Sequence, residues 1–178
     1  MQSQPSSPSI LKMVGLTILF LAPLIYCLVG MNTADLLWIS PLFDEQPEFI
    51  TIHCYGEDIT LGPGDSNFSG LNDLVNETLS GRKRWDSLTL SESTYQDYQH
   101  DPEMMSLEMR YSEAVRIHSR YKFFSNVDTL VIPLVGRHAQ TNAIFGRRFE
   151  NPAAGSFHVE TMVPLVEYLE KEELCSKP

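Results

Sequence analysis

Hydrophobic and polar positions divide this chain into two unequal parts. The first part contains an uncharged run of 19 mostly apolar residues, Met13 to Met31. At the helical rise of 1.5 Å per residue, this run spans about 28 Å, close to the thickness of the hydrocarbon layer of a bilayer. The pattern therefore predicts a transmembrane helix over residues 13–31, within which Pro23 is tolerated.

A cleaved signal peptide is the alternative explanation of the same run. Signal peptides have a shorter apolar stretch, about 7–15 residues, followed by small residues at the cleavage site. Here the run is longer, and residues 28–34 (LVGMNTA) contain no A-x-A pattern. We therefore favour an uncleaved signal anchor, with a secreted form released by cleavage as the alternative.

Charged residues beside the run indicate its orientation. Lys12 is the only basic residue before it, and the exit side is acidic, with no Lys or Arg until Arg82. Because basic flanks stay in the cytoplasm, the predicted location is the cytoplasmic membrane or an endomembrane, crossed once. The other parts are then a disordered cytoplasmic N-terminus (1–12), a juxtamembrane segment (32–47) and an extracytoplasmic domain (48–178).

The second part of the chain mixes strand-like and helix-like patterns. β-branched and aromatic residues at 49–55 and 59–61 flank turn residues, which predicts a strand pair. Residues 66–80 and 161–174 place apolar side chains at helical spacing, and Gly81 suits the end of the first helix. We predict an α+β fold: one N-terminal transmembrane helix, then a small, mainly antiparallel sheet domain with about two packed helices.

Four further strand segments complete the predicted sheet. Pro133 lies in one of them and cannot donate to a ladder, so we expect it at an edge or near a strand end. Residues 92–103 are polar and aromatic and predict a helical turn or loop. The strand segments are 85–90, 105–118 (interrupted by a turn or bulge), 127–135 and 143–149.

The chain is acidic, with 23 Asp and Glu against 13 Lys and Arg and a formal net charge of −10. This balance argues against general binding of nucleic acids. The charge is segregated, because residues 32–109 hold 15 acidic and three basic residues (net −12), whereas residues 110–148 hold two acidic and seven basic residues (net +5). The basic segment either pairs with acidic strands of the same domain or forms a positive cleft for an anionic ligand or partner.

Two predicted loops, residues 136–148 and 155–158, combine groups that bind anions and transfer protons. Arginine binds carboxylate or phosphate through paired hydrogen bonds, and histidine transfers protons near neutral pH. Loops between strands also carry these residue types for structural reasons, so a structural role is the competing interpretation. The candidates are Arg137, Arg147 and Arg148 for ligand binding and, more weakly, His138 and His158 for catalysis.

The three cysteines and the absence of cofactor motifs limit the chemistry further. Cys27 lies in the apolar run, whereas Cys54 and Cys175 are outside it and would pair in an oxidising compartment if the fold brings them together. The sequence contains no HExxH, no CxxC and no nucleotide-binding fingerprint. It therefore predicts neither a metal nor another cofactor.

These patterns favour a non-enzymatic role more than a catalytic one. We expect a single-pass membrane-anchored binding, assembly or accessory protein, such as a subunit of a membrane complex. Its expected partners are the lipid bilayer and a protein in or at the membrane. The alternative is a membrane-tethered, hydrolase-like enzyme that acts on an anionic substrate through the Arg/His loops.

Overall fold

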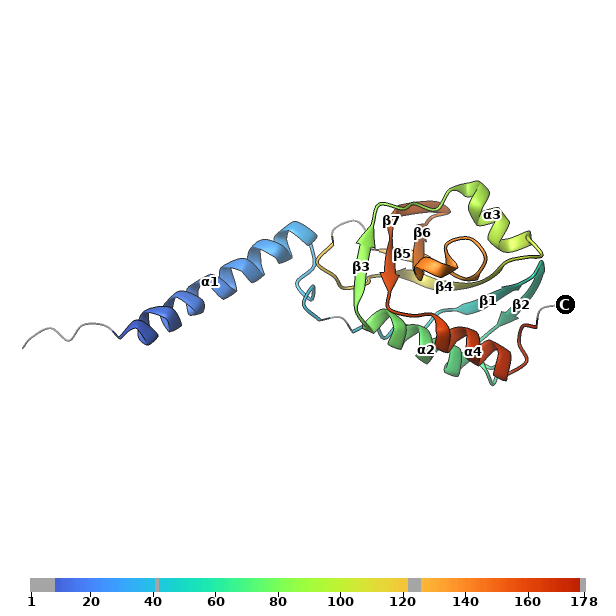
Figure 1. Ribbon diagram of the computed structural model, residues 1–178, viewed down its shortest axis with the longest axis horizontal. Coiled ribbons are helices and arrows are strands. Elements are labelled where there is room, and N and C mark those ends of the chain that lie inside the picture. Colours follow the sequence, from blue (N-terminus) through green and yellow to red (C-terminus); the bar gives the residue numbers. More distant parts are fainter. Residues whose placement is uncertain (1–8, 41, 122–125, 177–178) are drawn as a thin grey trace, which may run out of the picture.

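Alternating apolar and polar side chains build one antiparallel sheet (Figure 1). The computed structural model describes residues 9–40, 42–121 and 126–176, so most of the N-terminus that we expect to be disordered lies outside the described residues. Within them, the sheet has seven strands in the order β2-β1-β4-β5-β6-β7-β3. They are β1 (Phe49–Cys54), β2 (Glu57–Leu61), β3 (Lys83–Asp86), β4 (Met105–Val115), β5 (Val127–Val135), β6 (Ala143–Arg148) and β7 (Asn151–Val159).

Three α-helices cover the two faces of the sheet, and a fourth projects away from it (Figure 1). α2 (Phe68–Ser80) and α4 (Val163–Lys171) lie side by side on one face, and α3 (Glu92–His100) lies on the other. A short 3-10 turn, η1 (Ala139–Thr141), follows β5. The projecting helix is α1 (Ile10–Thr33), which by length and composition is apolar enough to cross a membrane, a test that a signal sequence also passes.

The main hydrophobic core lies between the sheet and the α2–α4 pair. Ile52, Leu107 and Phe157 project from the sheet to meet Leu79 and Leu169 of the two helices, and all five are fully buried. Successive side chains of a strand point to opposite faces, so the remaining strand positions face α3. On that side Tyr95, Tyr98, Val131 and Phe145 belong to a second, smaller apolar cluster.

The structure confirms an α+β domain with an antiparallel sheet but corrects the number of packed helices from about two to three. Residues 92–100 form a helix rather than a turn or loop. Ser91 caps it by accepting a hydrogen bond from the Thr94 amide at 3.2 Å. Tyr95 and Tyr98 lie on one side of it and are buried against the sheet.

Residues 151–159 form β7 and not the loop that we predicted at 155–158. The segment begins NPAAGS, which has a weak intrinsic preference for strand. It becomes a strand because it pairs with β6 on one side and β3 on the other. Gly155, at a φ of +84°, brings its backbone against the Trp85 indole, where a Cβ would clash.

The structure also decides three smaller points about strands and helix ends. The segment 105–118 contains one continuous strand, β4, and the predicted interruption is a register shift between Arg110 and Val115, as for a bulge and not a turn. Gly81 does follow α2, but its φ of −70° is not left-handed. Pro133 lies near the end of β5, as predicted, and it is accommodated there because β5 pairs with β6 only through Thr129 to Val131.

Cys54 and Cys175 form a disulfide in the structure, with their Cα atoms 5.6 Å apart. Cys54 ends β1, and Cys175 follows α4 near the end of the described chain. Cys175 is buried at 5% exposure. The bond therefore ties the C-terminal segment to the sheet across 121 residues of sequence.

Candidate functional site

The sheet face beneath α3 carries a buried group of polar side chains, the His53–Glu108 cluster (His53, Asp58, Tyr95, Glu108 and Arg110). The Tyr95 hydroxyl donates to Glu108 Oε2 at 2.7 Å, and Arg110 donates to Oε1 at 3.1 Å. His53 Nδ1 lies 2.7 Å from Asp58, and its Nε2 lies 3.5 Å from Glu108 Oε2. His53 and Glu108 are each only 4% exposed, so this face of the sheet contains charge that is shielded from water.

The two buried groups stabilise each other in their charged forms. Burial disfavours protonation of His53, but the carboxylates of Glu108 and Asp58 outweigh it and raise the pKa of His53 above its usual value. Burial also works against ionisation of Glu108. Contacts with His53, Tyr95 and Arg110 dominate and lower the pKa of Glu108 to about 2. Both shifts therefore favour the imidazolium–carboxylate form of this pair.

This pairing predicts a pH-dependent part of the stability. A raised pKa in the folded state contributes stability below the unfolded pKa of about 6.5, which is lost as pH rises through the folded pKa. We expect the stability advantage of the native chain over His53→Gln to shrink as pH rises from 6 to 9. Chemical denaturation of both proteins at each pH measures this difference. Lys83, whose pKa burial lowers to about 8, titrates in both proteins, so its contribution cancels. A constant or growing difference would contradict the pairing.

A cavity of about 890 Å³ lies beside this cluster, between α3, β4 and the β6–β7 hairpin; we call it the Arg147 cavity. Arg147 is 5% exposed, and its guanidinium lies 3.8 Å above the centre of the Tyr95 ring. It donates to Glu92 at 3.0 Å and to the Glu150 carbonyl. The charged side chains lining the cavity are Glu92, Arg110, Glu113, Asp128, Arg147 and Glu150.

The cavity has a surplus of negative charge. Its two arginines each have a carboxylate partner, Arg110 in Glu108 and Arg147 in Glu92. Four of the lining residues are acidic. A ligand with positive charge therefore matches this cavity better than the anionic ligand that the three arginines predicted.

The hairpin between β6 and β7 is strained and carries an exposed aromatic side chain at the cavity rim. Phe149 and Glu150 have φ values of 48° and 66°, a conformation that Asn and Gly adopt more easily than Phe or Glu. Three hydrogen bonds hold it: Phe149 N donates to Asp128 at 2.7 Å, Asn151 donates to the Phe149 carbonyl at 2.9 Å, and Arg147 donates to the Glu150 carbonyl. The Phe149 side chain nevertheless remains 74% exposed.

The structure does not bring the three predicted arginines into one cleft. Arg147 lines the cavity, whereas Arg137 and Arg148 are not among its lining residues. Arg137 instead donates to Thr94 at 3.1 Å and lies 3.4 Å from Asp97 on α3. Arg148 follows Arg147 on the same strand, and its guanidinium lies 5.3 Å from the centre of the Phe149 ring.

The two candidate histidines lie away from the Arg147 cavity. His138 Nδ1 lies 2.6 Å from the Tyr98 hydroxyl, and its ring contacts Phe145 edge-on. Burial, with smaller contributions from Arg137 and His158, lowers the pKa of His138 and favours the neutral ring. These contacts give His138 a structural role in holding the end of α3 to the loop after β5.

His158 lies on β7 between Ser156 and Asp86, an arrangement that superficially suggests a catalytic triad. Its Nε2 lies 3.3 Å from Ser156 Oγ and 3.8 Å from Asp86, and its Nδ1 donates to the Thr141 carbonyl at 2.8 Å. In a triad the acid contacts the other ring nitrogen and the hydroxyl is accessible. Here the acid faces Nε2 and Ser156 is fully buried, so the geometry does not match that mechanism.

Sequence reasoning did not single out Glu108, Tyr95 or Phe149. Glu108 lies between Leu107 and Met109, and strand alternation assigns it to the face opposite to these two apolar side chains. The available signal is an acidic side chain at the centre of a strand otherwise rich in large apolar residues. Recognising its burial requires α3, which the sequence pattern did not predict.

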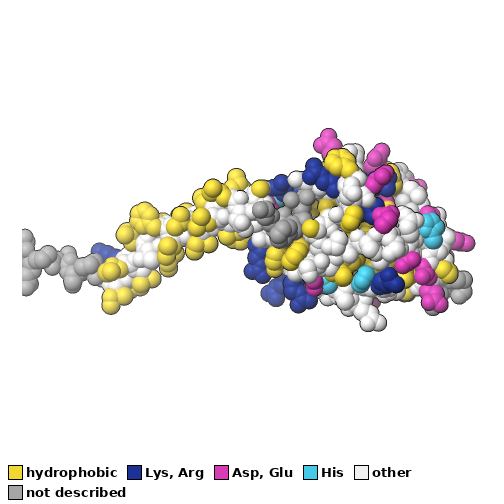
Figure 2. Space-filling model, turned by 90° about the horizontal axis from the view of Figure 1, so that it is seen from above, with side chains coloured by type: hydrophobic (Ala, Val, Ile, Leu, Met, Phe, Trp, Pro, Cys, Tyr) yellow, Lys and Arg dark blue, Asp and Glu magenta, His cyan; other side chains and the backbone are white. Residues whose placement is uncertain are grey.

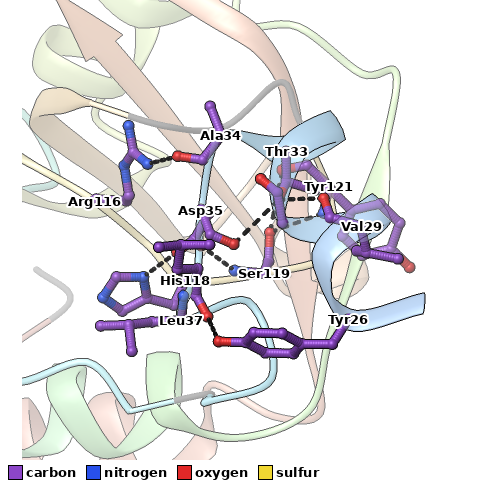
Figure 3. A network of polar contacts seen from close by, with 12 residues as sticks. Tyr26, Val29, Thr33, Ala34, Asp35, Leu37, Arg116, His118, Ser119 and Tyr121 are labelled. Carbon is purple, nitrogen blue, oxygen red and sulfur yellow. Dashed lines mark hydrogen bonds and ion pairs between the residues drawn. The ribbon is translucent and has the colours of Figure 1, made fainter. Parts of the chain in front are cut away.

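A second set of polar contacts joins α1 to the domain (Figure 3). Asp35, 6% exposed, accepts hydrogen bonds from the Leu37 and Ser119 amides at 2.9 and 3.3 Å, and lies 3.0 Å from His118 Nδ1. Arg116 donates to the carbonyl of Ala34, the residue that ends α1. A cation is favourable at a helix C-terminus, so α1 is fastened to the segment that follows β4.

Comparisons with family models, curated protein sequences and solved structures find no match to this chain. Among the described residues, no group of three or more His, Cys, Asp or Glu side chains is arranged to hold a metal ion. The Arg147 cavity, its strained hairpin and the fastened helix α1 are therefore the features from which a function is inferred.

Proposed function

We propose that this protein is a single-pass membrane-anchored accessory protein that holds a partner protein against the Arg147 cavity, outside the cytoplasm. The exposed apolar surface of α1 carries this proposal (Figure 2). Large apolar side chains between Met13 and Met31 are about half exposed or more, because the helix contacts the domain only near its end. Such a surface is unfavourable in water and is satisfied by a bilayer.

The β6–β7 hairpin supports binding of a protein partner. An exposed aromatic side chain beside a concave, polar surface is typical of an interface anchor. Strained backbone persists where the surroundings hold it, and it concentrates at functional positions. Both features meet at Phe149, on the rim of the Arg147 cavity.

The charge of the cavity indicates the chemistry of the partner. The carboxylates of Glu113 and Glu150 line the cavity and have no ion pair among the described residues. A segment with a Lys or Arg beside an apolar residue would match these carboxylates and Phe149 together. A protein in the same membrane would present such a segment at a constant distance from α1.

Anchoring is tested in membranes that contain the full chain. We expect the protein to stay in the pellet after an alkaline wash and its intact mass to include residues 13–31. Protease added to the extracytoplasmic side should remove the domain. Release by the wash, or a mass that begins after residue 31, would contradict anchoring, and protection of the domain from that protease would reverse the orientation.

Binding is tested in the same membranes with a photo-reactive amino acid in place of Phe149. We expect a discrete cross-linked product, because this side chain is exposed at the rim of the cavity. Thr60, exposed on the edge strand β2 and not part of the cavity lining, is the matched control position. Adding Glu150→Lys should lower the yield severalfold. Equal cross-linked products at both positions, or a yield unaffected by Glu150→Lys, would refute binding of a partner protein at this surface.

A further inference from the structure

The end of the domain next to α1 carries basic side chains, although the chain as a whole is acidic (Figure 2). A cavity of about 590 Å³ opens there, which we call the juxtamembrane cavity. Three segments that are far apart in the sequence form it: the segment after α1, the start of β3 and the segment after β4. The residues lining the cavity include Trp38, Ile39, Arg82, Lys83, His118 and Arg120.

Two arginines that line this cavity differ in their partners from three arginines elsewhere in the domain. Arg110, Arg137 and Arg147 each lie within 3.4 Å of a carboxylate. By contrast, Arg120 contacts only the Tyr121 side chain among the described residues, and Arg82 reaches Glu160 only at 3.9 Å, with 92% of its side chain exposed. Arg82 and Arg120 are therefore exposed cations of this cavity that an anionic ligand can reach.

Apolar side chains surround the same cavity on the side of α1. Leu36, Leu37, Ile39 and Leu42 are 55–65% exposed, and they continue the apolar surface of the helix. Trp38 folds back along α1, where its indole donates to the Tyr26 carbonyl at 3.4 Å. Trp and Tyr favour the boundary between hydrocarbon and headgroups, so a bilayer around α1 would place this segment at that boundary.

We propose that the juxtamembrane cavity binds the headgroup phosphate of an anionic phospholipid from the bilayer that holds α1. Arg82 and Arg120 are the cations that face the phosphate, and Trp38 and Ile39 lie where the upper acyl chain would pass. This inference rests on the proposed anchoring and is independent of the partner at the Arg147 cavity.

The basic end also offsets a repulsion. A domain with a large negative charge is driven away from an anionic membrane surface, whereas basic residues near that surface attract it by about 1 kcal/mol each, or about fivefold in affinity. Arg82 and Arg120 at the α1 end would orient the acidic remainder of the domain away from the lipid. The lipid contact would thereby hold the domain upright on the membrane.

The test uses the full chain in mild detergent, titrated with short-chain phosphatidylglycerol and followed by native mass spectrometry. We expect saturable binding of one lipid, with phosphatidylcholine at least tenfold weaker. Arg82→Gln with Arg120→Gln should weaken binding about 25-fold, since each cation contributes about fivefold. The matched control, Arg137→Gln with Lys171→Gln, removes the same charge from exposed positions outside the cavity and should change binding less than twofold.

Two further arms make the outcome decisive. Arg82→Lys with Arg120→Lys keeps the charge and should bind within about threefold of the native chain. Binding by this variant would show that weaker binding of the Gln variant comes from the lost charge and not from misfolding. Inorganic phosphate at the same concentration should not compete. Equal binding of the two lipids, full competition by phosphate, or an unaffected Gln variant would each overturn the proposal. None of these results would alter the alkaline-wash or cross-linking results, which test the proposed function separately.

Discussion

Replacing both Cys54 and Cys175 with serine is expected to lower the free energy of unfolding by about 2–5 kcal/mol. The bond closes a loop with a sequence separation of 121 residues, and long loops lose the most freedom in the unfolded chain when they are cross-linked. The bond also holds the segment after α4 against the end of β1. Without the bond, local unfolding should begin at Leu174 and the C-terminal end of α4.

Urea denaturation of the full chain, with and without reductant, measures this effect, and non-reducing peptide mapping identifies the bond. Cys27→Ser is the matched control, because this free cysteine lies exposed on α1 and its loss should not change the stability of the domain. Two free thiols at positions 54 and 175 in the native protein would contradict the bond. Equal stability of the oxidised and reduced chains would show that the loop contributes little.

Replacing Glu108 with alanine is expected to cost about 3 kcal/mol, the lower end of the range for breaking a buried ion pair. His53 would lose its buried anionic neighbour, and the Tyr95 hydroxyl would lose its acceptor. The loss stays at the lower end because His53 can release its proton and because Asp58 remains 2.7 Å from Nδ1.

Thermal and urea denaturation at neutral pH measure the change. Glu108→Gln keeps the size of the side chain and an acceptor for Tyr95, so it should cost less than the alanine variant. Glu113→Ala, an exposed position on the same strand, should stay within about 0.5 kcal/mol of the native chain. If Glu108→Ala were as mild as Glu113→Ala, the His53–Glu108 cluster would not be the stabilising feature that its burial implies.

Much of the fold followed from hydrophobic periodicity, and the exceptions share a physical cause. β5 and α2 could be predicted because their patterns are long and regular, with Leu130 and Ile132 on one face of the strand and Leu71 and Val75 on one side of the helix. β7 and α3 have weak local preferences. β7 forms because it pairs with β3 and β6, and α3 forms because Tyr95 and Tyr98 are buried against the sheet. Neither contact can be read from the local sequence pattern.

The candidate site also depends on tertiary contacts that the local sequence pattern does not predict. Counting charge along the chain located Arg147 in a basic segment, but it did not place Glu92, 55 residues away in sequence, beside its guanidinium. Sequence segregation of charge therefore predicted a positive cleft, while folding brought the acidic helix α3 over the basic strand. The internal pairing that we weighed against the cleft describes Arg110, Arg137 and Arg147, each of which lies beside a carboxylate.

In the proposed membrane-anchored protein, the turn at Ala34 and Asp35 would determine how far from the membrane the domain can act. A domain on a long flexible linker sweeps a wide volume and meets partners of many sizes. Here α1 passes into the domain within a few residues, and the contacts of Asp35 and Arg116 hold that passage in place. In the proposed membrane-anchored protein, the Arg147 cavity would thus be carried at a constant height above the lipid. Partners that diffuse in the same bilayer would be selected by matching height as well as by charge, and the fixed geometry would raise their effective concentration at the cavity.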